Sequence, residues 1–314
     1  MRATAPDLPL AILRGVGQVD FQSSFGTAVC FVVALFVGGW QFGVFGLLGT
    51  AVATLTAWIL GASRDRILGG LEGFNGTLIG VALVLYLGVH WITVLLVIVG
   101  AVMGSVLTSA LHAMLTPYRV PTFTAPFCAI TTFIVIGAPT FGRVWRGRTL
   151  ATPPSAARPG TALTFTDLWQ GLLNGIGQVF FQNRWYVGLI FLIGLLFADR
   201  IVALAAVVSS AIGIAVAWIL GAAAADIGAG LYGYNAVLIG IALCGTFVAL
   251  TPLGVLFAAF GVIAATVLTA FVGNLFAPVG GHTLTWPFVL VTWIFLAAVP
   301  VLSGVRRSDP KENS

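Results

Sequence analysis

The chain has 314 residues, of which 59% are hydrophobic and only 7% are charged, and its formal net charge is +5. An ordinary soluble domain carries about 25% charged residues, so this composition excludes a soluble globular protein and indicates one solvated by lipid. The basic residues, nearly all arginines, lie mostly between apolar runs or at the chain ends. That placement is typical of anchors at a membrane edge and not of a nucleic-acid-binding surface.

The first half of the chain contains one interrupted segment followed by five long apolar runs. The segment 8–22 includes Arg14, Gly15 and Asp20, so it predicts a half-helix that enters the membrane and stops. A spanning helix needs about 17–25 apolar residues, and each of the five runs is near that length. These runs are 25–41, 43–62, 74–90, 92–115 and 125–141.

The second half repeats this plan after a stretch rich in proline, alanine and arginine. That stretch, 142–164, predicts a linker at the membrane surface, and a broken segment near 165–183 follows it. Five apolar runs come next: 186–205, 207–221, 234–250, 253–276 and 288–303. We therefore expect one repeat over 1–141, a second over 165–303, and a polar tail over 304–314.

Three sequence blocks occur twice in the same order, about 160 residues apart. "AWILGA" begins at Ala57 and at Ala217, and 16 of 27 positions are identical between 57–83 and 217–243. "GVGQVDFQ" recurs as "GIGQVFFQ", and "PTFTAPF" recurs as "HTLTWPF". Chance similarity of apolar segments would not place Gln, Asn, Thr and Pro in register. Because each half has an odd number of expected spans, the second must enter from the opposite side, which predicts an inverted repeat with the substrate path between the halves.

The sequence lacks the usual patterns of catalytic and metal-binding residues. His90, His112 and His282 are isolated, with no HExxH or Cys/His ligand spacing, and no serine lies in a GxSxG motif. We therefore expect no enzyme, no cofactor and no metal. The three cysteines lie in apolar runs, where we expect small buried side chains: Cys30, Cys128 and Cys244.

Three carboxylates near the apolar runs have no acidic counterpart in the other half. They are Asp20, Glu72 and Asp226, which align with Phe180, Tyr232 and Arg66. An ionisable residue within a membrane is a functional candidate, but charges at helix ends or in surface loops are the interpretation that we favour. Their roles stay open at this point.

The two halves preserve uncharged side chains instead. The matched pairs are Gln18 with Gln178, Val19 with Val179, Phe21 with Phe181, Phe74 with Tyr234, Leu78 with Leu238, and Thr124 with Thr285. Such groups can line a narrow path for a small, flat, polar and neutral solute, because an ion would lose its hydration there without compensation. Singly, each residue has another interpretation. The phenylalanines can be core aromatics, each threonine can bond back to its own helix, and Thr-x-Pro can mark a helix start.

The blocks "GLEGFNGTLIGVAL", "GLYGYNAVLIGIAL", "TAPF" and "TWPF" resemble the urea transporter family, over about residues 8–303. The resemblance implies an all-α polytopic membrane protein with two inverted homologous halves, each of five transmembrane helices plus a half-spanning re-entrant helix. It also implies a homotrimer with one pore per protomer. The family's pore positions fall on the twelve paired residues. The glutamines lie at the mouths, the aromatics clamp the solute, Val19, Val179, Leu78 and Leu238 form the walls, and Thr124 and Thr285 form the central constriction.

The sequence departs from the family pattern at a few of these positions. Tyr234 replaces the usual phenylalanine and brings a hydroxyl near the slot. The Leu-Pro pair expected before the threonine reads Val120-Pro121 in the first half and Gly281-His282 in the second. The second change can alter the local turn. Some relatives have glutamate at the position of Gln18. Because this chain has glutamine there, the mouth of the expected pore carries no carboxylate at this position.

We therefore expect a channel-like urea transporter that mediates passive, selective permeation of urea down its gradient. Its expected partners are urea and membrane lipid, with no nucleic acid. We expect it in the inner or plasma membrane with cytoplasmic termini, although the balanced basic residues do not fix the orientation. The alternatives are a channel for a short amide, ammonia or water, and an ion-coupled secondary transporter. Coupled flux would favour the last and point to Asp20 or Glu72.

Overall fold

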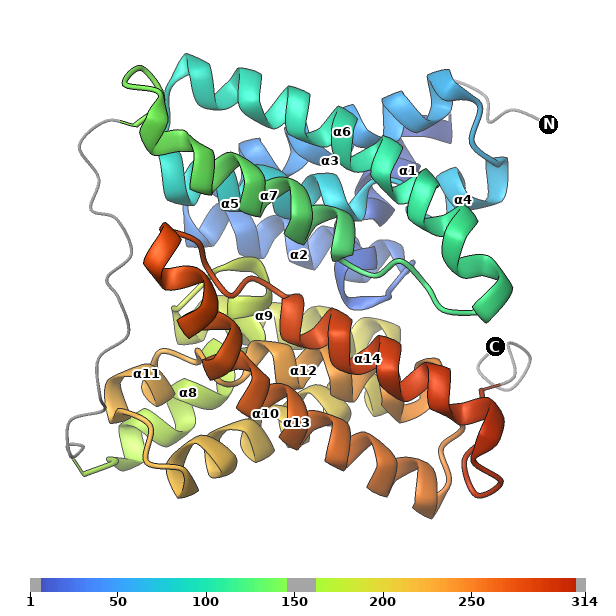
Figure 1. Ribbon diagram of the computed structural model, residues 1–314, viewed down its shortest axis with the longest axis vertical. Coiled ribbons are helices and arrows are strands. Elements are labelled where there is room, and N and C mark those ends of the chain that lie inside the picture. The colour runs from blue at the N-terminus through green and yellow to red at the C-terminus, as the bar shows by residue number, and fades with distance from the viewer. Residues whose placement is uncertain (1–6, 146–161, 309–314) are drawn as a thin grey trace. The chain divides into compact units, whose positions relative to one another are not determined.

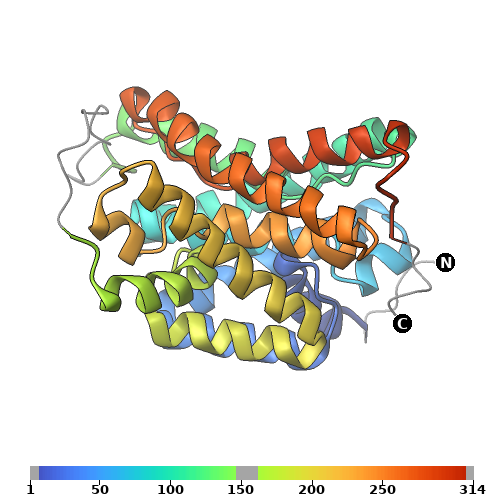
Figure 2. The same cartoon turned by 90° about the horizontal axis from the view of Figure 1, so that it is seen from below.

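The computed structural model describes residues 7–145 and 162–308, and these residues form helices joined by short turns. Both views show coiled ribbons along the described chain (Figure 1 and Figure 2). Within those ranges, the single strand-like pairing is an isolated bridge between Val248 and Arg307. The all-α fold class predicted from the sequence is therefore confirmed. Most of the predicted linker 142–164 and the end of the predicted tail lie outside the described residues.

The chain forms two compact units. The first contains described residues up to 145 together with Phe276–His282, and the second contains the rest of the described chain from residue 162. Elements α1 to α7, blue to green in Figure 1, lie in the first unit. Elements α8 to α14, yellow-green to red, lie in the second, apart from the end of α13 and the turn after it. The boundaries of the two predicted repeats stay predictions.

In the first unit, α5 is the most enclosed helix because α3, α6 and α7 all pack against it. The helices are α1 (Leu8–Gly17), α2 (Phe25–Gly38), α3 (Trp40–Leu60), α4 (Arg64–Leu68), α5 (Phe74–Leu87), α6 (Trp91–Leu115) and α7 (Ala125–Gly137). Three short turns of 3-10 helix accompany them: η2 (Gln18–Asp20), η3 (Thr116–Tyr118) and η4 (Ala138–Thr140). Helices α3 and α5 approach closely at Gly49 and Gly76, where a Cβ on either glycine would collide with the other's carbonyl.

The second unit repeats the same elements in the same order. The helices are α8 (Phe165–Gly177), α9 (Trp185–Ala198), α10 (Arg200–Ile219), α11 (Ala224–Gly228), α12 (Tyr234–Ile241), α13 (Pro252–Phe276) and α14 (Trp286–Ala298). The short turns are η5 (Gln178–Phe180), η6 (Ala242–Thr246), η7 (Ala277–Val279) and η8 (Val299–Val301). One difference is that α12 passes into a turn of π-helix, η6, whereas α5 stays α-helical. Helix α12 packs against α8, α10 and α14.

Four helices in the described chain are long and apolar enough to cross a membrane. They lie at Trp40–Leu60, Trp91–Tyr118, Arg200–Ile219 and Pro252–Val279. Two bent pairs, Leu8–Asp20 with Phe25–Gly38 and Phe165–Phe180 with Trp185–Ala198, bring the number to six if each pair is one span, with bends of 80° and 72°. Together with the composition, these helices make the chain a multi-pass membrane protein.

The helices differ in length from the apolar runs that predicted them. Runs 74–90 and 125–141 become α5 and α7, of 14 and 13 residues, and at about 1.5 Å per residue neither is long enough to cross alone. The prediction of one span over 186–205 is wrong, because the chain turns at Asp199. The Asp199 carboxylate accepts a hydrogen bond from the Ile201 amide at 2.7 Å and caps α10.

Candidate functional site

In the first unit, three chain segments that are far apart in the sequence meet at one place. The turn η2 packs against α5, and α5 packs against α7. The ring of Phe21, just after η2, contacts the ring of Phe123, just before α7, edge to face with 5.9 Å between centroids. The structure therefore brings together the segments that carry Gln18, Phe21, Phe74 and Thr124. In the second unit, η5, α12 and α14 pack in the same way.

The paired glutamines are held by matching hydrogen bonds. The Gln18 amide nitrogen donates to the Gly69 carbonyl at 2.8 Å, and the Gln178 amide nitrogen donates to the Ala229 carbonyl at 3.0 Å. Because the nitrogen faces the loop carbonyl, the side-chain oxygen Oε1 points elsewhere and can accept a hydrogen bond. Both side chains are half-buried, so each glutamine presents an acceptor in a fixed orientation.

A second bond beside each glutamine fixes the same loop. The Arg14 guanidinium donates to the Leu68 carbonyl at 3.0 Å, and in the second unit the Asn174 amide donates to the Gly228 carbonyl at 2.7 Å. Sequence comparison of the halves missed this pair, because arginine and asparagine are different residues that make the same bond. The shared feature is therefore a loop backbone carbonyl that accepts a hydrogen bond from a side chain of the first helix of the unit.

The aromatic residues after η2 and η5 adopt an unusual backbone conformation. Phe21 has φ of 63° and Phe181 has φ of 61°, in the left-handed region that costs a bulky residue about 1–2 kcal/mol. Both side chains are half-buried. The same left-handed residue therefore ends the same turn in both units.

Both threonines are N-caps. Thr124 precedes α7 and Thr285 precedes α14, each with a proline in the first helical turn, and neither side chain makes a cap hydrogen bond. The helix-start interpretation of Thr-x-Pro is thus confirmed. The residues before them, Phe123 and Leu284, again have left-handed backbones, with φ of 48° and 46°.

The remaining paired positions lie inside their own unit. Val19 and Val179 are buried, and Leu78 and Leu238 have no exposed surface. Phe74 is buried, whereas Tyr234 is half-buried. Their assignment as walls and clamps of a pore stays a prediction.

Sequence reasoning missed one further pair, Asn75 and Asn235. Asn75 follows Phe74 directly, Asn235 follows Tyr234, and both are fully buried. The Asn75 side-chain oxygen accepts from the Phe127 amide, and the Asn235 oxygen accepts from the Phe288 amide, each at 3.1 Å. The identity of this residue in both sequence blocks was the signal that could have found it.

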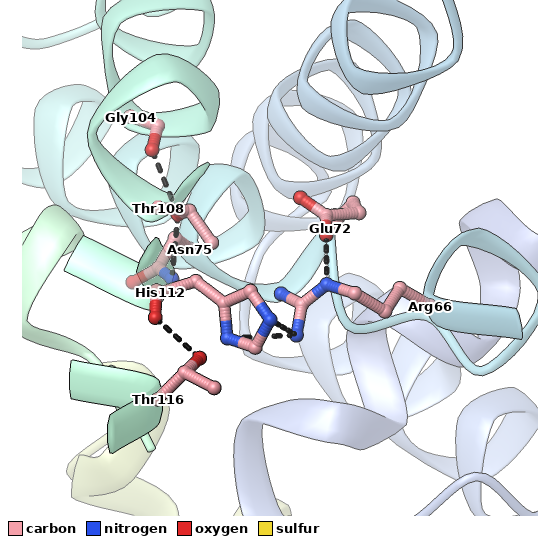
Figure 3. Close-up of polar contacts among 7 residues, drawn as sticks. All are labelled: Arg66, Glu72, Asn75, Gly104, Thr108, His112 and Thr116. Carbon is pink, nitrogen blue, oxygen red and sulfur yellow. Dashed lines mark hydrogen bonds and ion pairs between the residues drawn. The ribbon is translucent and has the colours of Figure 1, made fainter. Parts of the chain in front are cut away.

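Two of the three unpaired carboxylates are buried, whereas we had favoured helix ends or surface loops; Asp226 is half-buried in the first turn of α11, as the helix-end interpretation predicts. Asp20 is 1% exposed and Glu72 is 2% exposed. Glu72 accepts from Nε of Arg66 at 2.6 Å, and Arg66 also contacts the His112 ring at 3.3 Å (Figure 3). Among the residues that the structure describes, neither carboxylate oxygen of Asp20 has a hydrogen-bond partner. Asp20 lies at the end of η2, as the helix-end interpretation predicts, although it is buried. Glu72 is buried in the turn before α5, so the surface-loop interpretation is wrong for Glu72.

One departure from the family pattern, His282, and the counterpart of Glu72, Tyr232, also have a place in the structure. His282 stacks on Tyr86 at the end of α5, with 4.0 Å between ring centroids, and burial lowers the pKa of its imidazole. In the second unit, burial and then the nearby Asp226 charge raise the pKa of the Tyr232 hydroxyl. Tyr232 is thus a neutral residue where the first unit has Glu72.

Comparison with known proteins identifies the family. A sequence model described as "UT: Urea transporter" matches residues 10–300. This chain is 32% identical over 296 residues to Urea transporter 1 of Ovis aries, which covers 91% of this chain and 75% of that protein. Urea transporter 1 of Mus musculus is 32% identical over 294 residues with the same coverage. The chain belongs to the urea transporter family. The family predicted from the paired sequence blocks is confirmed, and this urea transporter family member is a membrane transporter and not an enzyme.

Proposed function

We propose that this chain is a channel-like urea transporter through which urea crosses the membrane passively, selectively and down its gradient. One observation carries the proposal beyond family membership. The same uncharged set of glutamine, aromatic and threonine side chains is held at the same backbone positions in both units. An uncharged path suits a neutral solute, whereas an ion would lose its hydration in it.

The side chains match the chemistry of urea. Urea is planar, with four N–H donors and one carbonyl acceptor. Leaving an amide-like group unpaired in hydrocarbon costs about 4–8 kcal/mol, so urea needs hydrogen-bonding partners along the path. The Oε1 atoms of Gln18 and Gln178 accept from its N–H groups, the threonine hydroxyls replace lost water, and the aromatic rings face its flat surfaces.

We further propose the finer features that the family resemblance implies. The two repeats, 1–141 and 165–303, are inverted, and three copies of the chain assemble with one pore in each. The protein resides in the inner or plasma membrane with both termini in the cytoplasm. The exposed apolar side chains along α2 and α9 support contact with lipid or with a second copy. Native mass spectrometry of the purified protein tests the trimer.

The function is tested by reconstituting the purified protein in liposomes and following urea-driven volume changes by stopped-flow light scattering. We expect urea flux well above that of empty liposomes, and equal with or without a proton or sodium gradient. Water and ammonia are the comparison solutes. Flux that requires an ion gradient would favour the coupled alternative, and flux of water or ammonia without urea would favour another neutral-solute channel.

A further inference from the structure

Two buried asparagines, one in each unit, bind the backbone around the paired threonines. Asn75 is 1% exposed and Asn235 is 0% exposed. In each, the amide nitrogen donates two hydrogen bonds and the side-chain oxygen accepts one. The partners occupy matching positions in the two units, so we treat the two asparagines as one repeated device.

The bond to the oxygen replaces the usual cap of a helix. The N-cap side chain normally accepts from the N–H of the second or third helical residue. Phe127 is the third residue of α7, and its N–H is bound by Asn75 at 3.1 Å, while Thr124, the N-cap, makes no cap bond. Pro126 has no N–H to offer. Asn75 therefore caps α7 from another helix, and Asn235 caps α14 in the same way.

The bonds from the nitrogen hold the residue before each threonine. The Asn75 nitrogen donates to the Phe123 carbonyl at 3.3 Å, and the Asn235 nitrogen donates to the Leu284 carbonyl at 3.4 Å. Phe123 and Leu284 each have a left-handed backbone. The bond is the same although one residue is phenylalanine and the other leucine, so the asparagine stabilises the strained backbone and not a particular side chain.

A third contact ties each asparagine to a long helix. The Asn75 nitrogen also donates to the Thr108 hydroxyl at 3.3 Å, and that hydroxyl donates to the Gly104 carbonyl at 2.8 Å (Figure 3). In the second unit, Asn235 bonds Thr269 at 3.2 Å, and Thr269 donates to the Ala265 carbonyl at 2.8 Å. The amide orientation is therefore fixed by partners on two helices and in the turn before one of them.

We propose that Asn75 and Asn235 are positioning residues of the urea path, an inference that rests on the proposed function. By bonding the backbone on both sides of Thr124 and Thr285, they fix the position of the two residues that carry these hydroxyls. Because each asparagine directly follows a clamp aromatic, Phe74 or Tyr234, it also sets the spacing between that ring and the threonine. A substitution that changes this spacing therefore changes the selectivity among solutes, in addition to any change in the amount of folded protein.

The test compares Asn75→Leu and Asn75→Asp with the wild type. Leucine removes all three bonds, whereas aspartate keeps the acceptor for the Phe127 amide and loses the donors. Thr131→Val is the matched control, because Thr131 lies on α7, the helix that Asn75 caps, and its buried hydroxyl has no hydrogen-bond partner in the described part of the chain. Two quantities are measured on folded protein: hydrogen exchange of the peptide over residues 125–131, and the ratio of urea flux to methylurea flux in liposomes.

We expect exchange at the start of α7 to rise about fivefold or more in Asn75→Leu, since a hydrogen bond is lost, and to change little in Asn75→Asp and Thr131→Val. We expect the urea-to-methylurea ratio to shift at least about threefold in both asparagine variants and to stay constant in the control. Unchanged exchange in Asn75→Leu would overturn capping from α5. Faster exchange with an unchanged ratio would overturn the positioning role.

The two readouts separate this inference from the proposed function. The exchange measurement needs no transport, so it judges the capping bond even if wild-type liposomes conduct no urea. In that case the proposed function fails, and with it the assignment of a urea-positioning role. If urea flux is present and the ratio is insensitive to both asparagine variants, only the inference about Asn75 and Asn235 fails.

Discussion

After Val19 the first unit has an aspartate, whereas after Val179 the second unit has a phenylalanine. Phe180 stacks on Phe191 of α9, with 4.5 Å between centroids. Asp20, at the matching position, has no hydrogen-bond partner within 7–145 and 162–308 for either carboxylate oxygen. The turns η2 and η5 nevertheless have the same length and the same left-handed residue after them. Residue 20 therefore does not determine the shape of the turn.

The features that the turns share are bonds to the backbone. The Gln22 side chain donates to the Asp20 carbonyl at 2.9 Å, and Gln182 donates to the Phe180 carbonyl at 3.1 Å. Together with the bonds from Gln18 and Gln178, these contacts are independent of what residue 20 or 180 carries. The repeated site is therefore held by side chain-to-backbone bonds, and these bonds persist although residue 20 is an aspartate and residue 180 is a phenylalanine.

The largest effect is expected when the second unit is given the first unit's aspartate. Phe180→Asp removes a buried aromatic side chain and buries an acid with no partner, which should destabilise the protein by about 4 kcal/mol. Thermal unfolding in detergent, followed by tryptophan fluorescence, measures the loss. A shift no larger than that of a surface substitution would mean that the stack with Phe191 does not stabilise the second unit.

A smaller loss is expected from Glu72→Gln in the first unit. The substitution leaves Arg66 without its ion pair, and because Arg66 is 25% exposed, we expect about 2 kcal/mol and not the 3–5 kcal/mol typical of fully buried pairs. The double variant Arg66→Met with Glu72→Leu should recover most of the loss. Asp226→Asn neutralises the carboxylate that the second unit has at the position of Arg66, and it should shift stability by less than about 0.5 kcal/mol. Equal losses at Glu72 and Asp226 would contradict this difference between the units.

The smallest effect is a gain. Asp20→Phe gives the first unit the aromatic residue that the second unit has at this position. In the first unit, Phe31 occupies the position of Phe191 and can stack on the new ring. We expect the variant to be more stable by about 1 kcal/mol, measured as a higher midpoint of thermal unfolding. A lower midpoint would show that Asp20 has a compensating interaction, and would point instead to a functional role for its carboxyl group.

Much of this architecture follows from local sequence, and the rest depends on distant contacts. Thr124-x-Pro126 predicts a helix start because proline suits the first turn, and the structure has one there. The pattern of apolar residues did not predict the helix break at Asp199, because the break depends on a single capping side chain. The role of Asn75 was hidden because its partners, Thr108 and Phe127, lie 33 and 52 residues away. The burial of Asp20 was hidden for a similar reason, since helix packing decides it.

The proposed function depends on the same uncharged site, present in both units, serving urea permeation. The most direct measurement compares urea flux through Thr124→Val and Thr285→Val with that of the wild type, in liposomes with equal amounts of folded protein. Both variants keep the side-chain shape and lose only the hydroxyl. We predict that both slow urea by a similar factor, about tenfold for one lost hydrogen bond of about 1.4 kcal/mol. Wild-type urea flux in either variant would contradict the account.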